Sequence, residues 1–262
     1  MTASSAYLAD SATMVRRNLR HMRRYPLLFF IAGLPVVLLL LFVYVFGGTL
    51  GAGLGEVTGG RAQYLAYVTP GIMLFTVAGG SQGTTIAVAM DVKEGIVARF
   101  RTMSISRASF LTGHVLANVL QTMLAVAIVV VVAVLIGFRA TTSPVEWIAA
   151  TGLLALATLA LTWVSVALAL VSKSVETASN LPLPLVLLPF FGSGFVPTAS
   201  MPEPLRWFAD NQPFTPIIET VRRLLAGGDV AGTGWIALAW CVAITLVGYL
   251  WARRLYDRDP AR

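Results

Sequence analysis

Charged residues are scarce in this 262-residue chain: Asp, Glu, Lys and Arg make up 12% of it, while 57% of its residues are hydrophobic. Ordinary soluble domains carry about 25% charged residues. The single cysteine, Cys241, excludes an internal disulfide, and the two histidines, His21 and His114, have no spacing typical of metal ligands. Neither lysine, Lys93 or Lys173, follows a glycine, which excludes the phosphate-binding loop G-x-x-x-x-G-K-[S/T]. The chain is therefore not expected to hydrolyse ATP through such a loop.

Long uncharged runs separate the few charged patches. Five of these runs have at least 20 residues: Leu27–Phe46, Ala62–Met90, Ala108–Phe138, Trp147–Ser172 and Val230–Ala252. About 20 apolar residues in a helix cross the hydrocarbon core of a bilayer. A sixth uncharged run, Thr177–Pro202, is broken by Pro182, Pro184, Pro189, Pro197 and Pro202. We predict an all-α membrane protein, a single domain over residues 1–262 with six transmembrane helices within residues 27–252.

The basic residues gather on one side of the predicted bundle. With six spans, both termini and 14 of the 19 Lys and Arg residues share a side, namely Arg16, Arg17, Arg20, Arg23, Arg24, Lys93, Arg99, Arg101, Arg107, Lys173, Arg253, Arg254, Arg258 and Arg262. Because basic residues favour cytoplasmic loops, we expect a multi-pass plasma-membrane protein with both termini in the cytoplasm. The net charge of +7 then serves topology and contact with anionic lipid headgroups, and it does not indicate nucleic acid.

The first 26 residues have the pattern of a helix at the membrane surface. An apolar stripe recurs at steps of four and three, formed by Leu8, Ala12, Val15, Leu19 and Met22. Five arginines lie beside or opposite this stripe, which predicts a cytoplasmic amphipathic helix within residues 1–26. A solvated basic tail is the alternative. Residues 253–262 are expected to form a short cytoplasmic tail.

The stretch before the last run predicts a helical hairpin. Pro204–Asp210 supplies one short helical turn, with Trp207 at headgroup level. A second helix is expected to be capped by Thr215 and to end at Gly227-Gly228. Its apolar stripe consists of Ile217, Ile218, Val221, Leu224 and Leu225, and its polar face of Glu219, Arg222 and Arg223. Since neither helix is long enough to cross the bilayer, we expect an extracellular re-entrant hairpin.

Polar side chains inside the runs are few and uncharged. The candidates for a substrate pathway are Ser81, Gln82, Thr84 and Thr85 of the second run and Asn180, Phe190 and Phe191 of the broken run. Simple helix packing is the alternative, and Gly79 and Gly83 are expected to form a small-residue face for it. Ser81 and Ser193 lie between glycines, which leaves an intramembrane protease conceivable, but no histidine lies mid-span as its base. A secondary carrier is the main rival, although proton-coupled carriers usually have ionisable residues within their spans, and here the only ones well inside the runs are His114, Cys241 and tyrosines such as Tyr44 and Tyr249.

A short charged loop follows the second run. Ile96, Phe100 and Met103 are spaced i, i+4 and i+7, so a short amphipathic helix presents them together. The loop either sets topology or docks another subunit, and exposed Phe and Met side chains favour docking. The chain thus has a membrane domain without an energy source and a loop suited to a partner.

Two segments resemble a known family. Asp91–Arg107 reads DVKEGIVARFRTMSISR and resembles the cytoplasmic segment between spans two and three of ABC-2 type permeases. Asn211–Arg222 reads NQPFTPIIETVR and resembles the N-x-P-x-T-P…R element of daunorubicin-resistance-type exporters. The likeness runs over nearly the whole chain in span order and length. One departure is Met103-Ser104, where the family commonly has a proline before the I/V-S-R ending.

The resemblance implies a type V ABC exporter fold and a permease subunit that works with partners. Two permeases, identical or homologous, would assemble with two ATP-binding ABC subunits, which hold the ATP and Mg; this chain itself would bind no cofactor. The implied coupling residues are Lys93, Glu94, Gly95, Arg99, Phe100, Arg101, Met103 and Arg107. The implied substrates are amphipathic drugs, lipids or polyketide-like molecules moved out of the cell. Export of a polysaccharide or glycolipid is the alternative.

Overall fold

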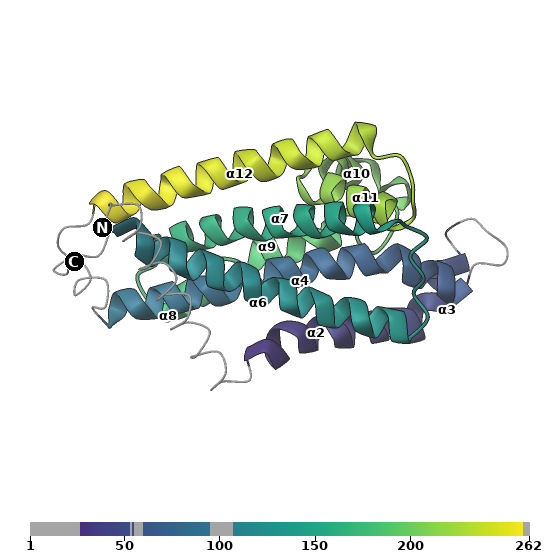
Figure 1. Ribbon diagram of the computed structural model, residues 1–262, viewed down its shortest axis with the longest axis horizontal. Helices are drawn as coiled ribbons and strands as arrows, with labels where there is room; N and C mark the ends of the chain where they lie inside the picture. The colour runs from purple at the N-terminus through teal and green to yellow at the C-terminus, as the bar shows by residue number, and fades with distance from the viewer. Residues whose placement is uncertain (1–26, 53, 55–59, 95–106, 259–262) are drawn as a thin grey trace.

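The computed structural model describes residues 27–52, 54, 60–94 and 107–258, and all secondary structure within them is helical (Figure 1). The elements are α2 (Leu27–Leu41), the π-helical η1 (Phe42–Phe46), α3 (Gly47–Ala52), α4 (Gly60–Lys93), α6 (Arg107–Leu135), α7 (Pro144–Val171), α8 (Val175–Asn180), α9 (Leu183–Leu187), the 3-10 helices η2 (Leu188–Phe191) and η3 (Thr198–Ser200), α10 (Glu203–Asn211), α11 (Phe214–Leu225) and α12 (Ala231–Arg258). The amphipathic helix predicted within residues 1–26 lies outside the described residues. The all-α class is confirmed.

Five described helical stretches are long and apolar enough to cross a membrane. They are Ile31–Ala52, Gly60–Lys93, Thr112–Leu135, Pro144–Val171 and Ala231–Tyr256. Each coincides with one of the five uncharged runs, so the absence of charge located them correctly. The last helix reaches Arg258, beyond the end of its uncharged run, so the first residues of the predicted tail are helical.

The sixth run forms no helix of comparable length. Its prolines lack the N–H that a helix interior needs, and the run divides into α8, α9 and η2, a shorter apolar stretch over Val175–Phe191. Thr142 of the α6–α7 connection donates to the Leu224 carbonyl, which places the starts of α7 and α12 at the same end of the bundle. The chain must therefore return along the bundle between them, and Figure 1 shows α8, α9 and α10 following one another from the end where α7 finishes to the end where α12 begins.

We call the end with α10, α11 and the start of α12 the hairpin end. The opposite end, where α4 finishes and α6 begins, is called the loop end. A large apolar core runs through the bundle on the hairpin side, and its cluster of buried side chains includes Tyr64 and Ile72 of α4 and Ile218 and Val221 of α11. A smaller core near the loop end contains Trp163 of α7.

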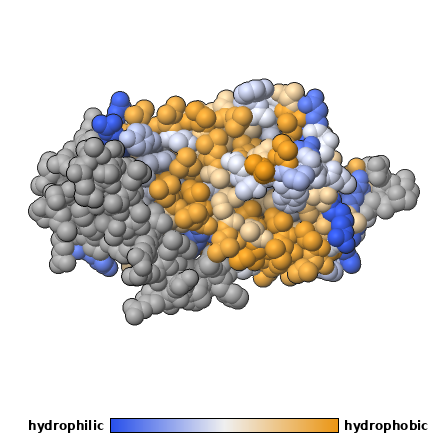
Figure 2. Space-filling view, viewed as in Figure 1, coloured by the Kyte–Doolittle hydropathy of each residue, from blue (hydrophilic) through white to orange (hydrophobic). Residues whose placement is uncertain are grey.

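Apolar side chains also cover the outside of the bundle. Large hydrophobic residues are exposed along α6 and α12, including Leu135 (78%) and Trp235 (74%). Figure 2 shows this apolar surface as a broad orange area between the two ends. A soluble protein rarely exposes so much contiguous apolar surface, so the surface is suited to lipid or to another membrane subunit.

Candidate functional site

The segment between α7 and α12 leaves regular helix where its sequence requires it. Helix stops at Phe191, and residues 192–195 continue as turns outside any helix. Where regular helix ends, backbone carbonyls lose their partners within the helix. In an apolar surrounding they must be bonded by other groups.

Side chains of α4 and α11 supply these bonds. The hydroxyl of Tyr64 donates to the Phe195 carbonyl over 3.1 Å, and that of Tyr67 to the Ser193 carbonyl over 3.0 Å. In the α10–α11 connection, the amide Nε2 of Gln212 donates to the carbonyl of Leu188, the first residue of η2, over 3.1 Å. The non-helical stretch is thus bonded by α4, and the short helix before it is bonded by the α10–α11 connection.

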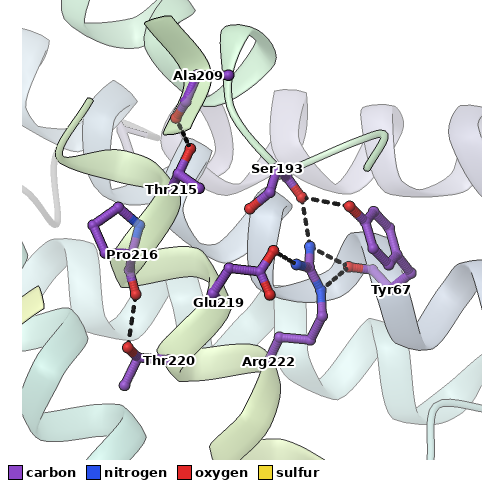
Figure 3. Close-up of polar contacts among 8 residues, drawn as sticks. All are labelled: Tyr67, Ser193, Ala209, Thr215, Pro216, Glu219, Thr220 and Arg222. Carbon is purple, nitrogen blue, oxygen red and sulfur yellow. Dashed lines mark hydrogen bonds and ion pairs between the residues drawn. The ribbon is translucent and has the colours of Figure 1, made fainter. Parts of the chain in front are cut away.

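Arg222 of α11 lies at the centre of these contacts (Figure 3). Its Nε and Nη2 atoms donate to the Tyr67 carbonyl over 3.2 and 3.1 Å, and Nη2 also donates to the Ser193 carbonyl over 2.6 Å. The guanidinium carbon lies 3.8 Å from the centre of the Tyr67 ring, a cation–π contact. Nη1 pairs with Glu219, three residues back on α11. One largely buried arginine, 14% exposed, therefore joins α4, the non-helical stretch and α11.

Glycines allow these backbones to approach closely. A Cβ on Gly71 would lie 2.2 Å from the Gly194 carbonyl oxygen, far inside van der Waals contact. A Cβ on Gly192 would lie 2.5 Å from Nε2 of Gln212. Gly71 faces backbone and requires the absence of a side chain, whereas a side chain at Gly192 would require Gln212 and Thr215 to shift. Among the described residues, no neighbour lies within 4 Å of where a Cβ on Gly79 or Gly83 would stand, so the prediction that they form the close-packing face is wrong for this part of the chain.

The two short helices of the predicted hairpin are present as α10 and α11, and two details of the prediction are wrong. The apolar stripe of α11 is buried, and Gly227 ends the helix with a φ of +69° while the N–H of Gly228 donates to the Arg223 carbonyl. Thr215 does not cap α11, because the helix begins one residue earlier and the Thr215 hydroxyl donates to the Ala209 carbonyl of α10. Arg222 does not face away from the bundle, because buried carbonyls of other segments accept from it.

The proposed pathway residues lie in three kinds of surroundings. Ser81, Thr84 and Thr85 are buried within the chain, and the Ser81 hydroxyl donates to the Ala78 carbonyl of its own helix. Gln82 of α4 donates to the Ser179 carbonyl of α8 over 2.7 Å, so the broken segment is also tied to α4 near the loop end.

The aromatic candidates of the broken segment behave differently from one another. Phe190 stacks on Phe195 with ring centres 4.3 Å apart and meets Phe75 edge-on at 5.4 Å. Phe191 is 46% exposed, and Asn180 is exposed as well. The structure therefore brings Gln82 to the broken segment and places Asn180 and Phe191 on the surface of this single chain.

A buried polar seam between α4, α6 and α7 was missed by the sequence analysis. Asn118 of α6 donates to the Thr162 hydroxyl of α7 over 2.8 Å. A Cβ on Gly80 would lie 2.2 Å from Oγ1 of Thr122, so α4 and α6 touch closely at this point. Asn118 and Thr122 are one turn apart on α6, and that spacing inside an apolar run was the available signal.

The described coupling residues lie at the loop end. Lys93 and Glu94 are exposed at the end of α4, and Arg107 begins α6. Nε2 of His114 lies 2.9 Å from Oδ2 of Asp91, a contact that joins α6 to the end of α4. The predicted coupling residues Gly95, Arg99, Phe100, Arg101 and Met103 lie outside the described residues. No group of three or more His, Cys, Asp and Glu that could hold a metal occurs within the part of the chain that the structure describes.

Comparison with known proteins gives the family. The ABC-2 type transporter family matches residues 11–225, and the chain belongs to that family. The chain is 29% identical over 244 residues to the daunorubicin resistance ABC transporter permease protein DrrB1 of Streptomyces coeruleorubidus, a match that covers 91% of this chain and 83% of that protein. It is 27% identical over 215 residues to a Mycobacterium tuberculosis protein named probable doxorubicin resistance ABC transporter permease protein DrrC, with 81% of this chain and 76% of that protein covered. The resemblance seen in the two sequence motifs is thereby confirmed.

Proposed function

We propose that this chain is the membrane-spanning permease subunit of an ATP-driven exporter that moves an amphipathic, drug-like or lipid-like molecule out of the cell. The observation that carries the proposal is the family match over residues 11–225, which includes the long helices α4, α6 and α7 and most of the hairpin. The names of both relatives support a drug among the substrates. The chain has no enzymatic role in this proposal.

The energy source is a separate subunit in this proposal. Two ATP-binding ABC subunits, carrying ATP and Mg, would serve two permeases, either two copies of this chain or this chain and a homologue. The stretch from Lys93 to Arg107 would dock in the ATP-binding subunit, with Phe100 and Met103 as apolar anchors and the arginines at the rim. The exposure of Lys93 and Glu94 at the end of α4 supports a partner at this end.

The topology proposed here has six crossings. The return of the chain along α8, α9 and η2 would be the fifth, despite its breaks, and the α10–α11 hairpin would be the extracellular re-entrant hairpin of a type V exporter. Both termini and the loop end would then face the cytoplasm. The 70% exposure of Trp207 on α10 is suited to the headgroup region on the opposite side.

The substrate pathway would follow the broken segment. Gln82 already bonds this segment, and the exposed Phe191 and Asn180 are free to contact a second permease or a substrate. Ser81, Thr84 and Thr85 would join the pathway only if α4 moves relative to the helices that bury them. Cysteines at Gln82 and Phe190 test this idea: labelling blocked by substrate supports the pathway, and labelling from the lipid phase that ignores substrate contradicts it.

Reconstitution tests the function. We expect proteoliposomes that contain this chain and its ATP-binding partner to transport daunorubicin only with hydrolysable ATP. A partner variant that binds but does not hydrolyse ATP is the control. Transport by this chain alone, driven by a pH gradient, would instead support a secondary carrier. Transport of a lipid-linked polysaccharide in preference to the drug would support the second alternative.

A further inference from the structure

We propose that Arg222 is a latch: it holds the hairpin end closed in the resting transporter and releases Tyr67 and Ser193 when that end opens. The proposal rests on the proposed transport function for its opening step. The closed arrangement itself is the geometry of Figure 3, in which one side chain bonds two segments other than its own.

The acceptors of Arg222 divide into two groups. Tyr67 and Ser193 belong to α4 and the non-helical stretch, and the bonds to them break if α11 moves away. Glu219 belongs to α11 itself and moves with Arg222. Moving α11 therefore breaks only bonds to neutral carbonyls. The charge of Arg222 stays paired with Glu219, and so opening avoids the large free-energy cost of an unpaired buried charge. An arginine that never leaves its acceptors does not need a carboxylate on its own helix. An arginine that is released reversibly needs one, and Glu219 meets this need.

The segment that Arg222 would release depends on hydrogen bonds from other elements. The Ser193 carbonyl accepts from both Arg222 and Tyr67, and the Phe195 carbonyl accepts from Tyr64. The stretch Gly192–Val196 lies outside any helix, in turns and a bend. Loss of Arg222 therefore loosens this stretch locally, since loops open at lower free energy than packed helices.

Arg223 provides a matched control next to Arg222. It carries the same charge on the same helix, but it is exposed and its Nη1 atom donates to the Asp229 carbonyl over 3.4 Å, within the α11–α12 connection. Its removal changes the charge of α11 without touching α4 or the non-helical stretch.

Ser193 is a suitable reporter position, because the latch uses its carbonyl and leaves its side chain out of the hydrogen bonds. The side chain is 2% exposed, so Ser193→Cys in a Cys241→Ala background should react slowly with a water-soluble maleimide. The assembled complex in lipid nanodiscs exposes both membrane faces to the reagent. We expect Arg222→Gln to raise the labelling rate about tenfold or more, and Arg223→Gln to leave it unchanged.

The native cysteine separates release of the latch from general loosening. Cys241 is fully buried in α12. In a protein that keeps Cys241 and Ser193, Arg222→Gln should leave Cys241 unlabelled. A rise at both positions, or no rise at Ser193→Cys, overturns the latch. If the Arg222→Gln complex does not assemble, Arg222→Lys replaces it under the same criteria. Lysine keeps the charge but lacks the planar guanidinium that donates to two carbonyls at once.

Nucleotide gives the second arm of the experiment. With the ATP-binding partner present, ATP turnover should speed labelling of Ser193→Cys in the parent and add little in Arg222→Gln, which is already released. If Arg222→Gln speeds labelling of Ser193→Cys but ATP turnover does not change labelling in the parent, the result contradicts the exporter and leaves closure by Arg222 intact. If ATP turnover speeds labelling in the parent but Arg222→Gln has no effect, the result supports the exporter and overturns the latch.

Discussion

The hairpin end and the loop end of the bundle are held together in different ways. At the hairpin end, Arg222, Tyr67 and Tyr64 bond the carbonyls of a stretch outside regular helix, and Gly71 lets two backbones touch. At the loop end, α4 and α6 are joined through Asp91 and His114 beside exposed Lys93 and Glu94.

This difference suggests that the two ends have different roles in the transporter. A buried arginine with several acceptors favours one closed arrangement of the hairpin end. Exposed charges at the loop end leave that surface available to a partner. Changes at the hairpin end should therefore alter stability and closure, and changes at the loop end should alter coupling.

The largest effect is expected at Gly71. Gly71→Ala places a methyl group 2.2 Å from the Gly194 carbonyl oxygen, with backbone on both sides. We expect a loss of about 2–3 kcal/mol of stability, measured by thermal unfolding in detergent. The control is Gly79→Ala on the same helix, where no neighbour among the described residues lies within 4 Å of the new methyl group and stability should hold. Equal stabilities of the two variants would contradict the close approach.

The second effect is expected in the predicted coupling loop. Phe100→Ala should weaken docking of the ATP-binding subunit by about 2 kcal/mol, because interface aromatics are common anchors. ATP hydrolysis should then continue without export. Val92→Ala, an exposed apolar change at the end of α4, is the control. Unchanged export by a correctly assembled Phe100→Ala complex would mean that the loop only sets topology.

A smaller effect is expected for Tyr67→Phe. This change removes the bond from the Tyr67 hydroxyl to the Ser193 carbonyl but keeps the ring beneath Arg222. We expect a loss of about 1 kcal/mol in thermal unfolding. Tyr44→Phe, which keeps an exposed ring beside Arg61, should change nothing measurable. If both variants lose equal stability, the Tyr67 hydroxyl has no special part in holding the hairpin end.

The smallest effect is expected for Asp91→Asn at the loop end. It weakens the contact with His114, and we expect a loss of about 0.5–1 kcal/mol in thermal unfolding. Asp210→Asn, in the exposed pair with Arg206, is the comparison and should be near zero. A loss at Asp91 larger than that of Gly71→Ala would reverse the proposed ranking of the two ends.

Much of the fold could be predicted from where charges are missing. Each of the five uncharged runs contains or overlaps a long apolar helix, because a lipid-facing helix cannot carry a charged face. The stripe of α11 and its glycine stop were also predictable, since helical periodicity and a left-handed C-terminal glycine are local features. The prolines indicated a broken segment, although not where its helices would begin and end.

The contacts of the site could not be predicted in the same way. Periodicity assigned Arg222 to the polar face of α11, but it carries no information on the carbonyls that α4 and Ser193 present to that face. Tyr67 and Arg222 are 155 residues apart in the sequence. The N-x-P-x-T-P…R element ends at Arg222. The motif therefore indicated that this residue matters, although the periodicity assigned it to the polar face. Which glycine of α4 allows the close approach, Gly71 or Gly79, likewise depends on where another segment crosses α4, and the sequence does not show this.

Thiol labelling of both ends in one preparation tests the account most directly. Lys93→Cys would report on the loop end and Ser193→Cys on the hairpin end, each in a Cys241→Ala background. The account predicts that adding the ATP-binding subunit without nucleotide protects Lys93→Cys and leaves the slow labelling of Ser193→Cys unchanged. Fast labelling at Ser193→Cys before any nucleotide is added, or no protection at Lys93→Cys, would contradict it.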